Sequence, residues 1–289
     1  MATKNPSLSI VMPCLNEAEN LVSLLPELKK AQPNAEILVI NDGSTDNSAG
    51  ICHEYEVKVI SHPKPLGNGA SIKTGAREAS GEIIIFMDAD GQHSPEDIQP
   101  LLDKLAEGYD MVVGARHSHT HASKGRLLGN TFFNKLASFM TGQKIEDLTS
   151  GFRAVRAKHF KKFLYLLPNG FSYPTTSTMA FFRSALPVAY IPIHAGKREG
   201  KSKIKLVKDG FRFFIIILKI GALFSPMRLF LPVSALTFFL GVLNHIHSYI
   251  TSGSFSNGSL LLYVASVFIF LMGILSEQIS SLHYRNTDN

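Results

Sequence analysis

The sequence predicts an α/β domain built on a mostly parallel sheet, followed by two helices that can span a membrane. Up to about residue 115, short apolar runs alternate with helical stretches of ten or more residues. This alternation is typical of a parallel sheet that is covered by helices on both faces. After about residue 204 the composition changes, and two apolar stretches of over twenty residues each carry almost no charge. About 20 apolar residues suffice to cross a bilayer.

The apolar runs are expected to form the strands. They are Leu8–Met12, Glu36–Asn41, Val57–Ser61, Glu82–Met87 and Met111–Gly114. The helices expected between them are Glu17–Lys30, Asn68–Ala79 and Pro95–Glu107. In such sheets ligands bind at the carboxyl ends of the strands, so polar residues that follow the strands mark a candidate site. These residues are Asn16-Glu17, Asp42 and Asp88 to Gln92.

A basic amphipathic segment precedes the two apolar stretches. Ile204–Phe224 carries four basic residues among many Phe, Ile and Leu residues: Lys205, Lys208, Arg212 and Lys219. This pattern fits a helix that lies on an anionic membrane surface, and a buried amphipathic helix is the alternative.

Leu229–Ile250 and Leu260–Leu282 are expected to be transmembrane helices. Their connector, Thr251–Ser259, has no charge, whereas Lys and Arg residues precede the first span and Arg285 follows the second. By the positive-inside rule both termini are cytoplasmic and the connector lies outside. Glu277 is expected to face the membrane interface or a neighbouring helix.

Charge and cysteine content limit the partners and the compartment. The 29 Lys and Arg residues against 23 Asp and Glu residues give a net charge of +6, which suits nucleic acid, anionic lipid or phosphorylated small molecules. Many of the basic residues flank apolar segments, so we expect no nucleic-acid partner. Cys14 and Cys52 do not resemble a disulfide framework, and Met1–Pro13 does not resemble a signal peptide. Both observations favour a cytosolic catalytic half.

An acidic cluster follows the fourth expected strand. Asp88 and Asp90 are two residues apart, and Gln92 adds a third side-chain oxygen. Mg²⁺ prefers oxygen ligands and is commonly held by one or two carboxylates together with substrate phosphates. Ser94 and Pro95 then begin the next helix as its N-cap and first residue. The cluster therefore predicts a divalent-cation site at a strand end, with a plain surface turn as the alternative.

Two other strand ends carry polar, turn-forming residues: Pro13-Cys14-Leu15-Asn16-Glu17 and Asn41-Asp42-Gly43-Ser44-Thr45-Asp46. Carboxylates there can bind ribose hydroxyls or base edges, whereas Asn16, Ser44 or Asp46 can also cap helices. Gly67-Asn68-Gly69 is not read as a dinucleotide fingerprint, because Ile72 occupies the place of the third glycine.

Six segments, in their order along the chain, resemble family 2 glycosyltransferases of the GT-A fold, a Rossmann-like architecture. The similarity is greatest to the dolichyl- and polyprenyl-phosphate sugar synthases, and it extends to a two-helix membrane tail. The segments are Pro13-x-x-Asn16-Glu17, Asn41-Asp42-Gly43-Ser44-x-Asp46, Gly67-Asn68-Gly69-Ala70, Asp88-Ala89-Asp90-Gly91-Gln92-His93, Val113-Gly114-Ala115-Arg116 and Thr149-Ser150-Gly151-Phe152-Arg153.

The resemblance implies roles for individual residues at the donor end. Asp88, Asp90 and Gln92 would bind the metal and the diphosphate, with Asp90 also counted as catalytic. Contacts to the nucleoside side of the donor would come from Pro13, Asn16, Glu17 and Asp42.

The resemblance also implies an acceptor end. Arg116, Arg126 and Lys203 would hold the phosphate groups of donor and acceptor, with Arg126 also counted as catalytic. Arg198 is expected to join them at the acceptor phosphate, and Arg153 is counted as substrate-binding. Asp147 matches an aspartate discussed as a catalytic base. A phosphate monoester has a second pKa of about 6 and is largely ionised at pH 7, so we expect Asp147 to orient groups more than to remove a proton.

One loop departs from the family pattern. His117, His119 and His121 alternate, which would put all three on one side of an extended chain. A metal site and an active-site loop are both compatible with this pattern.

The implied reaction is transfer of a hexose from a nucleotide-sugar, of the GDP-mannose or UDP-glucose type, to undecaprenyl or dolichyl phosphate. It would use Mg²⁺ or Mn²⁺, invert the anomeric carbon in a single displacement, and serve glycosylation of the cell envelope. The expected organisation is a GT-A catalytic domain over 1–203 on the cytoplasmic face, amphipathic interface helices over 204–228, and a transmembrane part over 229–289 that can also support a homo-oligomer.

Two alternatives stay open: a membrane-bound glycosyltransferase for another lipid or saccharide acceptor, and a non-catalytic scaffold on the GT-A fold. A processive polysaccharide synthase is excluded, because its Gln-x-x-Arg-Trp element needs a Trp and the chain has none.

Overall fold

Seven strands form one sheet in the computed structural model, which describes residues 6–116, 124–170, 172–193 and 206–285. Their order across the sheet is β3-β2-β1-β4-β6-β5-β7. All neighbouring strands are parallel except at β6, which is antiparallel to both β4 and β5, so the prediction of a mostly parallel sheet is confirmed. The strands are β1 Leu8–Cys14, β2 Glu36–Asn41, β3 Lys58–Ser61, β4 Ile83–Phe86, β5 Met111–Arg116, β6 Arg153–Arg156 and β7 Val188–Ile193.

The antiparallel strand β6 begins at the edge where its neighbours end. Arg153 pairs with Phe86, the last residue of β4, and with Val113 of β5. The segment that leads into β6, Asp147–Phe152, is therefore brought to the carboxyl edge of the parallel strands. Neither β6 nor β7 was among the expected strands.

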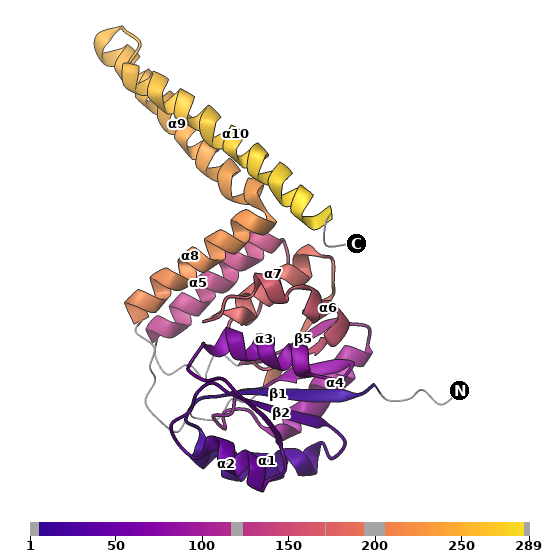
Figure 1. Ribbon diagram of the computed structural model, residues 1–289. Coiled ribbons are helices and arrows are strands. Elements are labelled where there is room, and N and C mark those ends of the chain that lie inside the picture. The colour runs from indigo at the N-terminus through magenta and orange to yellow at the C-terminus, as the bar shows by residue number, and fades with distance from the viewer. Residues whose placement is uncertain (1–5, 117–123, 171, 194–205, 286–289) are drawn as a thin grey trace. The chain divides into compact units, whose positions relative to one another are not determined.

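Helices cover both faces of the sheet (Figure 1). On one face lie α1 Ala18–Ala31, α2 Ser48–Glu54 and α4 Ile98–Ala106, and on the other lie α3 Asn68–Glu78, α6 Ala157–Lys162 and α7 Tyr173–Arg183. The helix expected over Pro95–Glu107 consists of a 3₁₀ turn over Pro95–Asp97 and α4. A second 3₁₀ turn, Leu164–Leu166, follows α6.

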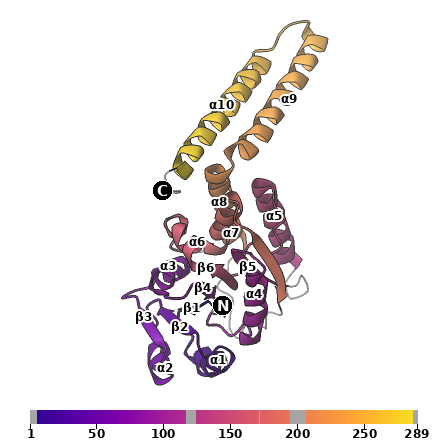
Figure 2. The same ribbon diagram turned by 90° about the vertical axis from the view of Figure 1, so that its right-hand side faces the viewer.

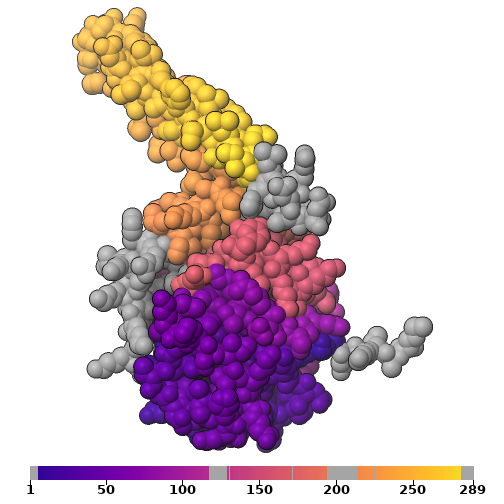
Figure 3. All heavy atoms as spheres, in the orientation of Figure 1, coloured from indigo at the N-terminus to yellow at the C-terminus, as the bar shows by residue number. Residues whose placement is uncertain are grey.

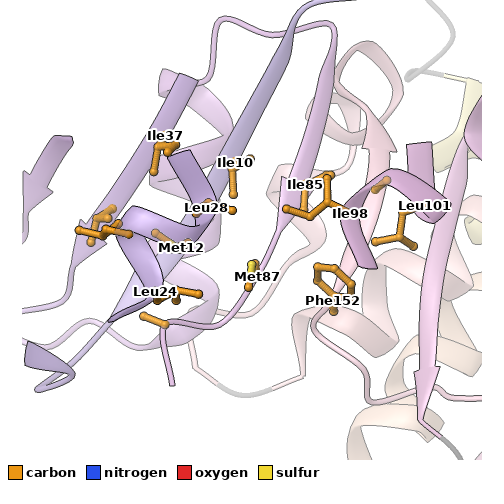
Figure 4. Packing of buried hydrophobic residues seen from close by; sticks show 14 of the residues in the cluster. Ile10, Met12, Leu24, Leu28, Ile37, Ile85, Met87, Ile98, Leu101 and Phe152 are labelled. Carbon is orange, nitrogen blue, oxygen red and sulfur yellow. The ribbon is translucent and has the colours of Figure 1, made fainter. Parts of the chain in front are cut away.

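The core follows the alternation of side chains along β1. Ile10 and Met12 point to the face of α1 and α4, where they belong to the same buried cluster as Leu24 (Figure 4). Val11, between them, faces α3, and the helix approaches closely there. A Cβ on Gly75 would lie 2.2 Å from Cγ1 of Val11, so only glycine fits this helix position.

The chain divides into two compact units. The first comprises Met1–Lys135 and Lys144–Phe213 and contains the sheet; the second comprises Leu136–Gln143 and Phe214–Asn289. Two helices contribute residues to both units, α5 Lys124–Thr141 and α8 Leu206–Phe224, whereas α9 Pro226–Ser252 and α10 Asn257–Arg285 belong to the second.

Helices α9 and α10 lie side by side as a hairpin (Figures 1 and 2). Pro226–Ser252 and Asn257–Ser280 are long and apolar enough to cross a membrane, in agreement with the two expected spans. Many large apolar side chains of α9 and α10 are exposed; Leu243 is 64% exposed and Leu261 is 69% exposed. Figure 3 shows the atoms of these two helices in orange and yellow. A surface of this kind matches the hydrocarbon of a bilayer.

Small and polar residues join the two helices. The hydroxyl of Ser234 donates to the carbonyl of Ser266 at 2.9 Å. Gly241 allows close packing, because a Cβ there would lie 3.0 Å from the ring of Tyr263. Glu277 accepts a hydrogen bond from the backbone N–H of Met227 at 3.3 Å, so the expected helix partner of this carboxylate is the start of α9.

Candidate active site

The loop after β4 carries the predicted metal ligands. Asp88, Asp90 and Gln92 are partly exposed, whereas Ala89 between the carboxylates is buried. The backbone N–H of Gln92 donates to Oδ1 of Asp90 at 3.2 Å, and Gly91 takes a positive φ of 70° in the turn between them. The loop thus places the side-chain oxygens of Asp88, Asp90 and Gln92 within five residues of one another, with each side chain partly exposed.

The chemistry of this loop fits a hard divalent cation. Within the described part of the chain, no group of three His, Cys, Asp or Glu side chains forms a site that could hold a metal without other ligands. Two carboxylates completed by substrate phosphates are, however, the usual arrangement for Mg²⁺. The residues present therefore fit a cation that binds together with a diphosphate.

The helix that follows the loop starts as expected. Oγ of Ser94 accepts from the N–H of Glu96 at 3.2 Å, and Pro95 occupies the first helical position. His93, which sequence reasoning left without a role, is 6% exposed and its ring stacks on Phe152 with the centroids 4.8 Å apart. Burial lowers the pKa of His93 to about 4, so the ring is neutral at pH 7 and packs as an aromatic side chain.

The loops after β1 and β2 are tied to each other. Oδ1 of Asn16, which has a φ of 59°, accepts from the N–H of Thr45 at 2.8 Å. Oδ2 of Asp46 accepts from the N–H of Ala18, the first residue of α1, and the N–H of Glu17 donates to Ser48. Asp46 therefore accepts from an N–H at the start of α1, but the N-cap positions of α1 and α2 are occupied by Glu17 and Asn47, so none of the expected residues is itself the N-cap. Asn16 and Glu17 lie at the carboxyl end of β1. Pro13, one residue before the end of β1, is half-buried.

Asp42 organises the loop that leads into α3. Its Oδ1 accepts from the N–H of Leu66 at 2.8 Å and from Nδ1 of His62 at 2.7 Å, and its Oδ2 accepts from the N–H of Gly67 at 2.8 Å. A carboxylate only accepts, so Nδ1 of His62 is the donor; Nε2 faces the hydroxyl of Thr74 at 3.0 Å. Sequence reasoning did not identify His62.

The Gly67-Asn68-Gly69 segment serves close packing. The N–H of Gly69 donates to the carbonyl of Gly170 at 3.0 Å, and a Cβ on Gly69 would lie 2.0 Å from the carbonyl oxygen of Pro168. Gly67 has a φ of 105°. The glycines therefore let α3 begin against the 168–170 loop, which agrees with the rejection of a dinucleotide fingerprint.

Arg116 and Asp147 form an ion pair at the end of β5. Nε of Arg116 donates to Oδ2 of Asp147 at 2.9 Å and Nη2 donates to Oδ1 at 3.1 Å. Burial would raise the pKa of Asp147, but the hydrogen bonds and the charge of Arg116 outweigh it and hold this pKa below its ordinary value. Burial likewise opposes the charge on Arg116, yet Asp147 and then Asp88 leave the pKa of Arg116 raised.

Arg153 occupies a different environment from the one expected of a substrate ligand. It is fully buried, and its Nη1 donates to the carbonyl of Pro174 and to the hydroxyls of Ser177 and Thr178. Its Nη2 donates to the carbonyl of Ser150. With no exposed surface, the guanidinium binds backbone carbonyls and buried hydroxyls of the protein, and a contact to substrate does not fit this structure.

The comparisons with known proteins decide the family. Residues 9–164, more than half of the chain, match the family model described as Glycosyl transferase family 2. The chain belongs to glycosyl transferase family 2. Residues 225–282 of this glycosyltransferase match a second model, the GtrB C-terminal hairpin, which covers α9 and most of α10.

Several curated relatives are similar to this glycosyltransferase. An undecaprenyl-phosphate 4-deoxy-4-formamido-L-arabinose transferase of Yersinia enterocolitica is 29% identical over an alignment of 312 positions, which covers 97% of this chain and 90% of that protein. A polyprenol monophosphomannose synthase of Mycolicibacterium smegmatis is 28% identical over an alignment of 211 positions, which covers 68% of this chain and 80% of that protein. A dolichol-phosphate mannosyltransferase of Pyrococcus furiosus is 34% identical over an alignment of 214 positions, which covers 68% of this chain and 59% of that protein.

A solved structure supports the fold. Glucosyl-3-phosphoglycerate synthase from Mycobacterium tuberculosis, in complex with Mn²⁺, uridine-diphosphate and phosphoglyceric acid, has a TM-score of 0.63. The similarity covers 75% of this chain and 79% of that chain at 18% identity. This glycosyltransferase therefore has the architecture of the enzymes that the sequence resembles.

Several residues that the sequence analysis singled out lie outside the described part of the structure. They are Arg198, Lys203, His117, His119 and His121, and the side chain of Arg126 in α5. Their roles stay predictions. The structure brings Asp88, Asp90, Arg116 and Asp147 to one edge of the sheet.

Proposed function

We propose that this enzyme transfers a hexose from a nucleotide-sugar to the phosphate of a polyprenyl phosphate. The observation that carries the proposal is that Asp88, Asp90 and the Arg116–Asp147 pair lie at one edge of the sheet, in a chain with two candidate membrane spans. One end of this site suits a metal-bound diphosphate, and the other suits a phosphate anion. The names of the three relatives contain polyprenol, undecaprenyl phosphate and dolichol phosphate, which supports a lipid acceptor.

At the donor end, Asp88, Asp90 and the side-chain oxygen of Gln92 would hold Mg²⁺ or Mn²⁺. When bound, such a cation neutralises the negative charge that grows on a leaving diphosphate. The protein holds Asp90 on its loop through the N–H of Gln92. The related structure with Mn²⁺ and uridine-diphosphate supports a divalent cation in this fold.

At the acceptor end, the phosphate is largely ionised at pH 7 and needs no general base. One of its oxygens attacks the anomeric carbon as the bond from that carbon to the diphosphate oxygen breaks. The nucleoside diphosphate leaves, and the configuration at the anomeric carbon inverts. Arg116 would attract the acceptor phosphate, and Arg126, Arg198 and Lys203 are proposed to join it.

The membrane topology completes the proposal. Residues 1–203 would form the catalytic part on the cytoplasmic face, 204–228 the interface helices, and 229–289 the membrane part. The uncharged connector between α9 and α10 would lie outside. A polyprenyl phosphate keeps its chain in the bilayer, so the phosphate would meet the site at the depth of the headgroups.

The test incubates the purified full-length protein and undecaprenyl or dolichyl phosphate with labelled UDP- and GDP-hexoses, with and without EDTA. We expect a labelled lipid product that disappears with EDTA, and the donor that gives it identifies the nucleoside. The absence of a metal-dependent lipid product from every donor would overturn the proposed reaction. Asp90→Ala is the matched control, because Asp90 is partly exposed and its loss should not disturb the sheet.

A further inference from the structure

We propose that Tyr173 is a positioning residue for the metal ligand Asp88, and that it acts through the backbone of Gly151. The role of Asp88 rests on the proposed function. Tyr173 begins α7 and is 3% exposed. Its hydroxyl donates to the carbonyl of Gly151 at 2.7 Å.

Gly151 lies between Tyr173 and Asp88. A Cβ on this glycine would be 3.3 Å from Oδ2 of Asp88 and 3.3 Å from the hydroxyl of Tyr173. The two side chains therefore meet at one residue that has no side chain of its own. Because the hydroxyl hydrogen of Tyr173 is donated to Gly151, it is not available to Asp88. Tyr173 thus fixes the surface against which Asp88 lies and does not bond to Asp88 itself.

The segment Asp147–Arg153 is held from both of its ends. Asp147 accepts from the N–H groups of Thr149 and Ser150, and the guanidinium of Arg153 donates to the carbonyl of Ser150. Tyr173 then holds the next carbonyl along the chain. Gly151 is thereby fixed by contacts on its own carbonyl and on the residue before it. A rigid backbone at this position limits where the carboxylate of Asp88 can lie.

Tyr173 is itself fixed by the protein interior. Its ring lies 5.6 Å from the guanidinium carbon of Arg153, a cation–π distance, and it makes an edge contact with Phe86 at 5.9 Å. Ser172, directly before it, has a φ of 86°, a conformation that a non-glycine residue rarely adopts. Burial also raises the pKa of Tyr173, so its hydroxyl keeps the proton that it donates. The positive φ of Ser172 costs conformational free energy, which is consistent with a functional constraint at this position.

Tyr173→Phe tests the proposal, because it keeps the ring and removes the hydrogen bond to Gly151. Tyr190→Phe is the matched control. Like Tyr173, Tyr190 is a tyrosine whose pKa is affected by the charge of Arg153, but among the described residues its buried hydroxyl has no hydrogen-bond partner. The readouts are Mn²⁺ affinity in the presence of UDP or GDP, followed by electron paramagnetic resonance, together with kcat and the thermal midpoint.

We expect Tyr173→Phe to weaken Mn²⁺ binding about tenfold and to lower kcat, with the Tyr190→Phe protein unchanged in both. Gly151→Ala retains Tyr173 and places a methyl group against Asp88, so it should also weaken Mn²⁺ binding. If Tyr173→Phe fails to fold, the Gly151→Ala protein is measured in its place. Wild-type Mn²⁺ affinity in a folded Tyr173→Phe protein, or an equal loss in Tyr190→Phe, would overturn the proposal. Mn²⁺ binding is measured without turnover. The result therefore does not depend on whether polyprenyl phosphate is the acceptor, and failure of the proposed reaction can be told apart from failure of the proposal for Tyr173.

Discussion

Asp147 and Arg116 hold each other in a largely buried ion pair, and this contact decides what Asp147 can do. The carboxylate accepts six hydrogen bonds, three from Arg116, two from Thr149 and one from Ser150. With this many hydrogen bonds, the carboxylate has no vacant lone pair that could take a proton from the acceptor substrate. The geometry supports the proposal that Asp147 orients Arg116 and the Thr149–Ser150 backbone.

Asp147→Asn should therefore destabilise the protein and raise the KM for the lipid phosphate, because Arg116 loses its partner. Breaking a buried pair costs about 3 kcal/mol, which corresponds to a thermal midpoint lower by about 6–12 °C at pH 7. A lowered carboxyl pKa stabilises the fold above the ordinary value of about 3.9, and this stability is lost as the pH falls below it. The difference in midpoint between wild type and variant should thus shrink below about pH 4.

Glu146→Gln is the control for this experiment. Glu146 is adjacent in sequence but half-exposed, and it pairs with the exposed Lys144. We expect a change within about 0.5 kcal/mol. Loss of turnover in Asp147→Asn with stability, donor binding and acceptor binding all intact would contradict an orienting role and favour a general base.

Residue types and strand ends were enough to predict part of the site. Asp88, Asp90 and Asp42 follow buried apolar runs, and such carboxylates can be found from pattern alone. Tyr173 and His62 could not be found in this way, because each acts on a residue distant in sequence through a single hydrogen bond. Arg153 was assigned to substrate because sequence shows charge and not burial.

At the scale of elements, the parallel strands β1 to β5 were predictable, whereas the antiparallel β6 and the parallel β7 were not. β1, β2 and β4 are apolar runs with helical patterns between them. β6 has four residues, Arg153–Arg156, with an arginine at each end, and nothing in its composition marks it as a strand. Its pairing with β4 and β5 depends on contacts that are distant in sequence, so tertiary structure decides its conformation.

The start of α3 offers a prediction about packing between elements. Gly69→Ala should destabilise the protein by about 1–3 kcal/mol, because the new methyl group would overlap the carbonyl of Pro168 and push α3 away from its loop. Gly170→Ala, in the same contact region, has open space for a Cβ and should change stability little. Thermal unfolding of both variants checks this, and equal midpoints would show that the loop yields without cost.

The start of α9 offers a second prediction at this scale. Glu277 accepts from the N–H of Met227, one of the helix-end donors that the helix cannot satisfy itself. Glu277→Leu should destabilise the hairpin by about 1 kcal/mol, whereas Glu277→Gln keeps an acceptor oxygen and should be milder. Helicity during unfolding in detergent is the measurement. A leucine variant as stable as wild type would show that the carboxylate contributes nothing as a cap.

At the scale of the whole molecule, the question is which side of the membrane each part occupies. The basic residues before α9 and the uncharged connector Gly253–Ser256 favour a cytoplasmic catalytic part and an external connector. The chain is suited to a direct test, because both native cysteines are buried, Cys14 at 2% exposure and Cys52 at 0%. A thiol reagent should therefore react poorly with the wild-type protein.

Ser254→Cys should be labelled by a membrane-impermeant maleimide in intact spheroplasts, since Ser254 is exposed in the connector. Ser23→Cys, on the exposed side of α1, should be labelled only after the membrane is opened, because the catalytic part is proposed to lie inside. The two variants differ only in which part of the chain carries the thiol, so each serves as the control of the other. Labelling of Ser23→Cys in intact spheroplasts would reverse the proposed topology. It would also place the site away from cytosolic nucleotide-sugars, so the donor assignment depends on this result.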